Sequence, residues 1–248
     1  MTIDYPMQTT GLRQLWKEAF GDSDAFLDVF FSHGYSPRRC RCITDDGQVA
    51  AALYWFDCSF AGKKIAYLYA VATAVSHRGK GLCRKLMADT HALLANQGYA
   101  GAILVPGEGS LFDFYAAMGY ETISCADTIR CIAGEKPVPV AKLSPETYAA
   151  RRWQLLPEKG VLQEGENLTF LAEICTLYGG DGWIMAASTE EKALTAMEFL
   201  GDCAAIPGIL TALGKQEGTF RTPGSAPFAM YLPFDGGAAP TYFGLAFD

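Results

Sequence analysis

The sequence lacks the features that would place it in several common classes. It has no uninterrupted apolar run of the roughly 18 residues that a membrane span needs. Residues 1–11 show no basic segment followed by an apolar one, as a signal peptide would. Positive charge is not in excess either, because 27 Asp and Glu outnumber 20 Lys and Arg and leave a net charge of −7. We therefore expect a cytoplasmic protein with no membrane partner and no nucleic-acid partner.

The cysteine and histidine patterns indicate no metal centre. The eight cysteines include no CxxC pair, and the three histidines complete no metal-ligand spacing, so we expect free thiols and no bound metal. Core-forming residues, in contrast, are plentiful: 50% of the 248 residues are hydrophobic and 12% are aromatic. This composition excludes a disordered chain, and the length allows one to two domains.

Apolar periodicity predicts alternating helices and strands in the first half of the chain. Apolar residues recur at helical spacing in residues 10–20, 22–33, 82–97 and 110–118. Ser110 and Asp113 resemble a capping box at the start of the last of these helices. Strands are expected at 39–44, 48–60, 65–75, 100–105 and 120–132. Tight turns at 45–47 and 61–64 make the first three strands an antiparallel meander.

A second unit is expected after residue 135. Residues 134–140 (GEKPVPV) hold two prolines and no core pattern, which favours a domain boundary between residues 135 and 136. The fold class predicted is α/β of the α+β type: a mixed, mostly antiparallel sheet flanked by helices in residues 1–135, then a smaller α/β domain in 136–248. Helices in this second domain are expected at 145–156, 166–178 and 206–213, and strands at 182–187, 193–200, 228–234 and 241–247.

The residues that indicate chemistry are concentrated in one loop. After the expected strand 65–75 come Arg78, Gly79, Lys80 and Gly81, and then an amphipathic helix. Glycines allow a tight turn whose N–H groups converge on phosphate oxygens, and the helix start adds its positive dipole end. A diphosphate suits this loop. The sequence is not that of a P-loop, and the third glycine of a dinucleotide-binding fingerprint is missing.

Here the sequence resembles the GNAT superfamily of acyl-CoA-dependent N-acyltransferases. The first motif of that family is an apolar strand end, then (Gln/Arg)-x-x-Gly-x-(Gly/Ala), then a helix. This sequence has VATAV at 71–75 and RGKGLC at 78–83, with Cys in place of the final Gly or Ala. The resemblance implies acetyl-CoA as cosubstrate, bound by Val71, Ala72, Thr73, Arg78, Gly79, Lys80, Gly81, Leu82 and Cys83.

The second motif of the family is a strand, a short helix with a tyrosine, and a Gly-aromatic pair. Residues 103–105 (ILV) and 114–120 (FYAAMGY) are similar to it, although the family often has Asn where this sequence has Glu108. The resemblance covers about residues 10–133. The two motifs in this order are more specific than either would be alone.

The resemblance implies a mechanism for acyl transfer to an amine. Backbone groups of 68–73 would hold the pantetheine arm, and the Tyr115 phenol would protonate the departing CoA thiolate. The alternative for Tyr115 is an aromatic that packs in the core. Glu108 is a candidate general base, but it could equally be a loop carboxylate at the start of a helix. Other candidates are a water chain and four side chains, namely His33, Asp57, Tyr67 and Tyr69.

The second half resembles the degenerate acetyltransferase-like domain of tandem GNAT proteins, among them relatives of the mycobacterial enhanced-intracellular-survival acetyltransferases. Its loop at 201–205 has no cation and carries Asp202, which would repel a diphosphate, so we expect no second CoA site. In those relatives the C-terminal carboxylate can act as a base. The same role is conceivable for Asp248, the alternative being a plain edge strand at 241–247.

Two functions follow from the resemblance. The first is an N-acetyltransferase that acts on a primary amine of a small molecule or peptide, and the alternative is a non-catalytic acyl-CoA-binding or sensing protein. A phosphate-ligand protein unrelated to the family is a third. The negative net charge favours a cationic acceptor such as a polyamine, an aminoglycoside or a lysine side chain. A homodimer is compatible with these features.

Overall fold

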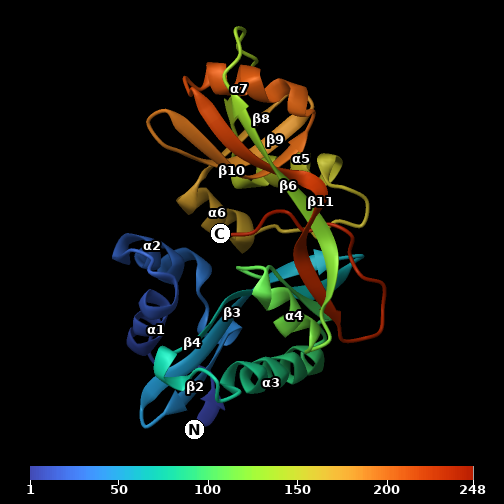
Figure 1. Ribbon diagram of the computed structural model, residues 1–248. Coiled ribbons are helices and arrows are strands. Elements are labelled where there is room, and N and C mark those ends of the chain that lie inside the picture. Colours follow the sequence, from blue (N-terminus) through green and yellow to red (C-terminus); the bar gives the residue numbers. More distant parts are fainter. Residues whose placement is uncertain (248) are drawn as a thin grey trace.

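One eleven-stranded sheet runs through both halves of the molecule in the computed structural model, which describes residues 1–247 (Figure 1). Its strands follow the order β1-β2-β3-β4-β5-β11-β10-β9-β8-β7, and β6 pairs with β11 beside this path. The strands are β1 (Thr2–Asp4), β2 (Cys40–Asp45), β3 (Gln48–Phe60), β4 (Lys63–Thr73), β5 (Gly101–Leu104), β6 (Glu121–Ile132), β7 (Ala141–Lys142), β8 (Thr176–Gly180), β9 (Trp183–Thr189), β10 (Ala193–Gly201) and β11 (Glu217–Pro233).

Helices cover this sheet in both halves, and the predicted mixed α/β class is confirmed (Figure 1). Helix α1 coincides with its prediction, because Leu12, Leu15 and Trp16 bury one face of it and Gly21 ends it at a φ of 76°. The helices are α1 (Thr10–Phe20), α2 (Asp24–Val29), α3 (Leu82–Asn96), α4 (Ser110–Ala116), α5 (Pro145–Leu155), α6 (Glu166–Ile174) and α7 (Ile206–Ala212). Short 3₁₀ or π turns occur at Phe30–Gly34, Pro37–Arg39, Val75–His77 and Cys203–Ala205.

Two tight hairpins set the register of β2, β3 and β4. Asp46 and Gly47 both have positive φ (46° and 80°), and so do Ala61 and Gly62 (51° and 74°). Two such residues in a row make the two-residue turn whose twist matches that of paired strands. The second turn is shorter than the predicted 61–64, and β4 therefore begins at Lys63.

Strands β4 and β5 separate shortly after they pair. They are parallel neighbours only at Ala66↔Ala102 and Tyr67↔Ile103. Further along, β4 contains a bulge against β3, because the register passes from Tyr54↔Tyr69 to Ala52↔Ala72, and Ala70 there has a φ of 49°. A positive φ at a non-glycine residue is strained. The sheet is consequently open on the β5 side of the second half of β4.

The long strands β6 and β11 connect the two halves. Strand β11 first pairs in parallel with β10, from Glu217 to Phe220, and later antiparallel with β5, from Met230 to Pro233. It pairs with β6 along both stretches, and Figure 1 shows the two strands crossing together from one half to the other. The predicted boundary between residues 135 and 136 stays a prediction. The last part of β11 nevertheless completes the sheet of the first half.

Part of the predicted helix 166–178 is a strand. Helix α6 ends at Ile174, and Thr176–Gly180 forms β8 against β9. Short apolar runs fit either structure, so periodicity alone did not separate them. Glycine is needed at position 180 of this strand, because a Cβ there would lie 2.4 Å from the Trp183 ring nitrogen.

The predicted strand 241–247 was also wrong, since among residues 1–247 only one bridge, Gly160↔Tyr242, forms there. Its backbone groups bind side chains instead of a neighbouring strand: the Ser124 hydroxyl bonds both the N–H and the carbonyl of Phe243, and the Gln163 amide donates to the Leu245 carbonyl. Buried backbone groups need partners of one kind or the other. The segment is buried between the two halves.

Strand β11 is longer than the predicted 228–234. Its first part, from Glu217, was missed because Pro223 and Pro227 are typical of loops. The structure places both prolines at register shifts between β11 and β6, which is where a sheet tolerates proline.

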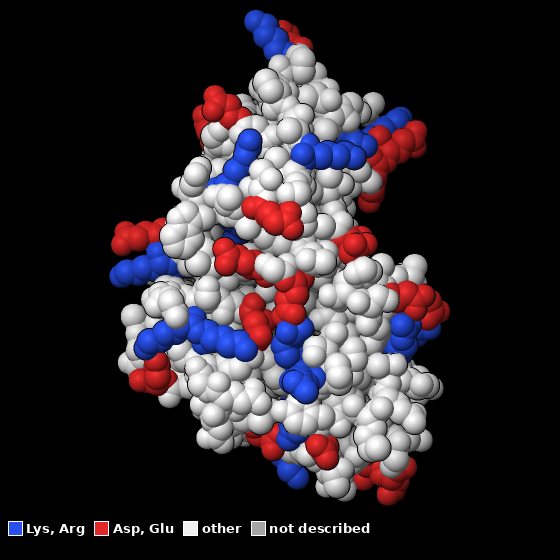
Figure 2. Space-filling view, turned by 180° about the vertical axis from the view of Figure 1, so that it is seen from behind, with Lys and Arg blue, Asp and Glu red and all other residues white. Residues whose placement is uncertain are grey.

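The junction between the halves contains an ion pair and a buried amide. Arg39 binds Glu166 of α6 (2.6 Å), and Asn167 donates to the Asp57 carbonyl oxygen (2.7 Å). On the face turned to the viewer in Figure 2, acidic side chains gather near the middle, with Lys and Arg directly below them. Polar contacts as well as the sheet therefore fix the halves relative to each other.

A fully buried ion pair stabilises the second half. The Arg152 guanidinium contacts both carboxylate oxygens of Glu198 (2.7 and 2.9 Å), and the Tyr242 hydroxyl donates to the same carboxylate (3.2 Å). The Glu198 side chain is 0% exposed and that of Arg152 is 2% exposed. Removing one charge would leave the other buried without a partner. This destabilises the folded state more than replacing both charged residues by apolar ones would.

We therefore expect Glu198→Gln to lower the free energy of unfolding by about 3–5 kcal/mol, measured by urea denaturation. The control is Asp28→Asn, which removes the exposed partner of Arg13 and should change stability by no more than about 0.5 kcal/mol. Equal effects of the two substitutions would contradict the assigned role of the buried pair.

Candidate functional site

The loop before α3 presents a set of unpartnered backbone N–H groups. Gly79 and Gly81 have φ values of 72° and 75°, and α3 begins at Leu82 with Gly81 as its N-cap. Within residues 1–247, no backbone or side-chain oxygen accepts a hydrogen bond from the N–H groups of 79–84, and the first helical bond is Lys85 N–H to the Gly81 carbonyl. Such N–H groups at a helix start bind anions.

The start of this loop is anchored from two sides. His77 Nε2 lies 3.2 Å from Asp45 Oδ2 on β2, and the Val75 N–H donates to the Glu18 carboxylate of α1 (2.6 Å). The Arg78 Nε group donates to the Thr73 carbonyl (3.3 Å), which ties the loop to the end of β4. The conformation is therefore held in place before any ligand binds.

A pocket of about 340 Å³ lies at this loop. Two guanidinium groups, those of Arg78 and Arg84, line it, and Arg84 also stacks over the Phe114 ring of α4 (5.2 Å). Burial raises the pKa of the Cys83 thiol to about 11, so that the thiol stays protonated. The structure brings together six of the predicted cofactor-binding residues here: Thr73, Arg78, Gly79, Gly81, Leu82 and Cys83.

A larger cavity of about 650 Å³ occupies the opening between β4 and β5. Tyr115 lines it from α4, and Val71 lines it from β4. The Tyr115 hydroxyl has no hydrogen-bond partner among residues 1–247, and burial raises its pKa well above the ordinary value of 10.0. This phenol therefore keeps its proton at neutral pH and can donate it, but it is not a base.

Three predicted site residues line neither space. Ala72 is buried, and Lys80 is exposed. Glu108 is exposed and accepts a hydrogen bond from the Ser110 hydroxyl (2.6 Å). The capping box predicted from Ser110 and Asp113 was wrong, because α4 has Gly109 as its N-cap without a side-chain bond. The catalytic role of Glu108 stays a prediction, although its position is that of the alternative, a loop carboxylate beside a helix start.

We expect Glu108→Gln to leave kcat within about twofold of the wild-type value. An amide can still accept the hydrogen bond from Ser110, whereas loss of a general base lowers the rate by about 10²-fold or more. Initial rates of thiol release at saturating acetyl-CoA and amine give the comparison. A hundredfold loss with unchanged stability would assign Glu108 the role of base.

The other base candidates separate clearly. Tyr67 and Tyr69 line the cavity from β4. Asp57 does not line the cavity, and its carboxylate binds Lys64 (2.9 Å) and the Tyr99 hydroxyl (2.5 Å) instead. His33 is exposed and does not line the cavity either. Asp248 lies outside the described residues. Up to Phe247 the chain follows the cavity, with the Phe247 carbonyl accepting a hydrogen bond from Tyr69 (2.9 Å).

Sequence reasoning missed the rest of the cavity wall. Trp16 and Asp22 come from the α1–α2 region, Met197 from β10, and Phe228 from β11. The only signal was the resemblance to a family in which an acceptor must lie opposite the thioester. Sequence distance hid these residues, because they are brought together by the long β6–β11 connection and by the buried segment before Phe247.

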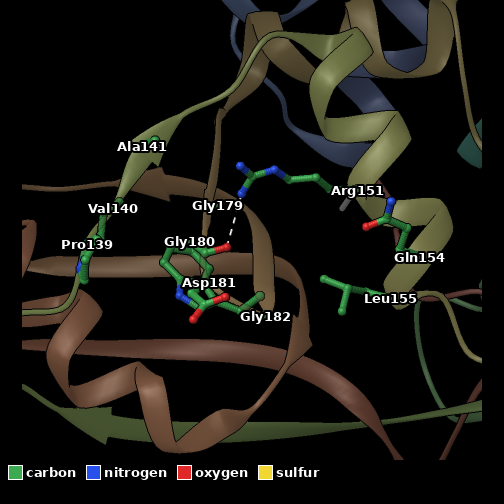
Figure 3. Close-up of a pocket in the computed structure, with 11 residues that line it drawn as sticks. Pro139, Val140, Ala141, Arg151, Gln154, Leu155, Gly179, Gly180, Asp181 and Gly182 are labelled. Atoms are coloured by element: carbon green, nitrogen blue, oxygen red, sulfur yellow. Dashed lines mark hydrogen bonds between the residues drawn. The ribbon is translucent and has the colours of Figure 1, made fainter.

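A separate cavity of about 500 Å³ lies in the second half, between α5 and the turn from β8 to β9 (Figure 3). Arg151 donates to the Gly180 carbonyl oxygen there (3.1 Å), beside Asp181. No motif residue lines it. Within residues 1–247, no group of three His, Cys, Asp or Glu side chains is placed to hold a metal ion, and no helix is long and apolar enough to cross a membrane.

Comparisons with known proteins identify the fold. A comparison with curated protein sequences found no match. Among solved structures, the chain is similar to a GCN5-related N-acetyltransferase from Kribbella flavida (TM-score 0.70, 15% identity, 94% of this chain and 71% of that chain). It is similar to one from Anabaena variabilis (TM-score 0.71, 14% identity, 93% and 72%). A third is Eis1 from Mycobacterium abscessus (TM-score 0.67, 14% identity, 95% and 74%).

The sequence comparison agrees with the structural one. Residues 7–123 match the family model described as the acetyltransferase (GNAT) domain. This range contains β4, the loop 78–81, α3 and α4, and so both motifs on which the resemblance rested. Residues 7–123 therefore have the sequence pattern of a GNAT acetyltransferase domain, and the mixed α/β fold of the protein is the GNAT fold.

Proposed function

We propose that this protein transfers an acetyl group from acetyl-CoA to a primary amine of a small molecule or peptide. One observation carries the proposal: the unpartnered N–H groups of residues 79–84 adjoin an open edge of β4 that leads directly to Tyr115. The pocket at the loop and the cavity beyond it can hold the two ends of one long ligand. Coenzyme A has a diphosphate at one end and a thioester at the other.

The loop suits the diphosphate on charge as well as on hydrogen bonding. Residues 76–85 contain four Lys or Arg and no acid, in a chain whose net charge is −7. Two of these cations, Arg78 and Arg84, line the pocket. The positive end of the α3 dipole adds to their field. The diphosphate would accept hydrogen bonds from N–H groups that have no other partner.

The bulge in β4 suits the thioester end. Beyond Tyr67↔Ile103, no ladder pair joins β4 to β5 among residues 1–247, and the strained Ala70 interrupts the ladder to β3 as well. A strained backbone conformation persists only where the surrounding structure holds it in place, and such residues cluster at functional sites. We infer that pantetheine amides complete the β4 edge and hold the thioester beside Tyr115.

The reaction then needs three proton transfers. The neutral amine nitrogen attacks the thioester carbon, a C–N bond forms, and the C–S bond breaks with its electron pair on sulfur. The Tyr115 hydroxyl gives its proton to that thiolate. The new amide nitrogen loses its extra proton to solvent or to a base on the cavity wall, and Tyr115 regains a proton from solvent.

Two measurements test this function. Acetyl-CoA at about 100 times its Kd should raise the melting temperature by about 5–10 °C, the effect of about 2.7 kcal/mol of binding on a domain of this size. A panel of primary amines should then give thiol release above background. Stabilisation without turnover of any amine would favour the acyl-CoA sensor, and stabilisation by ATP or ADP-ribose but not by CoA would favour an unrelated phosphate ligand.

A further inference from the structure

The part of the cavity wall that lies outside β5 and α4 is aromatic. Trp16 packs within a cluster of rings, with ring centroids 4.5 Å from Phe30, 5.2 Å from Tyr54 and 5.7 Å from Tyr69. The aromatic side chains on the cavity that come from outside the β5–α4 side are Trp16, Phe20, Phe26, Tyr67, Tyr69, Phe228 and Phe247. Such a wall gains from contact with apolar surface and from contact with a cation above a ring.

One charged side chain faces this cavity among the described residues that line it. It is Asp22, which lies in the turn between α1 and α2 and is half-buried. The Trp16 indole N–H donates to its Oδ2 atom (2.7 Å), and within residues 1–247 the Oδ1 atom has no hydrogen-bond partner. The carboxylate is thus held in place by the aromatic wall, with one oxygen left for a ligand.

An exposed ring lies beside this carboxylate. Phe20 lines the cavity at the end of α1 and is 46% exposed, although most large apolar side chains of this protein are buried. An apolar ligand that entered past Asp22 would cover this ring. A strongly hydrated ligand would gain nothing from it and would lose water against the other rings.

We propose that the acceptor is a primary amine with a single positive charge on an apolar body about the size of a ring, such as an arylalkylamine, and that Asp22 binds its ammonium group on entry. The inference rests on the proposed N-acetyltransferase function. It differs from the expectation drawn from net charge, which favoured a polyamine, an aminoglycoside or a lysine side chain. Several charges or hydroxyls on the acceptor would be placed against rings, and among residues 1–247 the cavity wall offers them one carboxylate.

The charge and the shape of the acceptor can be tested separately. Phenethylamine is cationic at neutral pH, whereas O-benzylhydroxylamine has nearly the same shape and is neutral. Asp22→Asn keeps an acceptor for the Trp16 N–H but removes the charge. We expect it to raise the KM for phenethylamine roughly tenfold or more and to leave the KM for O-benzylhydroxylamine within about twofold. A purely structural role of Asp22 would change both values together.

The matched control is Asp24→Asn. Asp24 lies two residues further on, pairs with Lys17 at the surface, and does not line the cavity. Both KM values should stay at the wild-type level in this variant. The apolar preference is tested by spermidine, whose kcat/KM should be at least about tenfold lower than that for phenethylamine, in line with the transfer of a ring from water to an apolar wall.

The outcomes separate this inference from the function on which it rests. If acetyl-CoA stabilises the protein and spermidine is the better acceptor, the enzyme is confirmed and the acceptor class is wrong. If Asp22→Asn changes the KM for the charged and the neutral amine equally, Asp22 does not recognise the positive charge of the amine. If acetyl-CoA does not bind, the proposed function itself fails before any acceptor is compared.

Discussion

Gly81→Asp is expected to abolish the stabilisation of this protein by acetyl-CoA, with a loss of affinity of at least about 100-fold. Gly81 has a φ of 75° and precedes the first turn of α3. An L-residue in this conformation costs about 1–2 kcal/mol, so the loop would move away from its anion-binding geometry. The added carboxylate would also face the diphosphate. Its negative charge would repel the diphosphate and would offset the favourable field of the α3 dipole.

The chain contains a matched control for this substitution. Gly47 has a φ of 80° in the turn from β2 to β3, and a Cβ at either glycine would have no heavy atom within 4 Å. Gly47→Asp therefore introduces the same strain and the same charge at a residue that lines neither the loop pocket nor the larger cavity. It should cost similar stability and keep the full melting-temperature shift with acetyl-CoA. Loss of the shift in both variants would mean that general destabilisation, not the loop, explains the result.

Tyr115→Phe is expected to lower kcat about 10²- to 10⁴-fold, the range for loss of a general acid. The ring would stay in place against Phe114 and Tyr120, so the KM for acetyl-CoA should change little. Initial rates of thiol release at saturating substrates measure this. A loss of less than about threefold would mean that solvent protonates the thiolate and that Tyr115 only packs.

The pH dependence of the same reaction gives an independent check on Tyr115. Burial raises the pKa of its hydroxyl above the ordinary value of 10.0. Because the acting form is the protonated one and the shift is upward, kcat should not fall as the pH rises towards 10. A kcat that declines with a midpoint well below this value would contradict Tyr115 as the proton donor.

Tyr120→Phe serves as the control for the tyrosine experiment. Tyr120 lies next to Tyr115 (ring centroids 5.9 Å apart), but its hydroxyl bonds His91 (2.8 Å) and it does not line the cavity. This variant loses a buried hydrogen bond, so stability should fall by about 1–3 kcal/mol. At a temperature where it stays folded, its kcat should equal that of the wild type.

Local sequence was sufficient to predict the conformation of the loop 78–81 and the helix start after it. The loop 78–81 depends on glycines with positive φ and on an adjacent helix start, and both are properties of consecutive residues. The hairpin at Asp46-Gly47 was predictable for the same reason. The resemblance to the family added Tyr115, whose short helix follows the buried strand β5.

Local sequence was not sufficient to predict the wall of the larger cavity. Asp22 and Phe228 meet at one cavity only because β11 leaves β10 and returns to pair with β5. The prolines of β11 concealed half of that strand, and the segment before Phe247 looked like a strand although side chains bind its backbone. These features depend on contacts between distant residues, which a periodic pattern does not contain.

The most direct test of the account is a product analysis with acetyl-CoA and phenethylamine, in which free CoA and acetylated amine are quantified together by mass spectrometry. The account predicts that the two products form in equal amounts, that Tyr115→Phe suppresses both, and that Gly47→Asp suppresses neither. CoA release without acetylated amine, or acetyl-CoA binding with no acetylation of any amine in a broad panel, would contradict the claim that this fold performs N-acetyl transfer at the opening between β4 and β5.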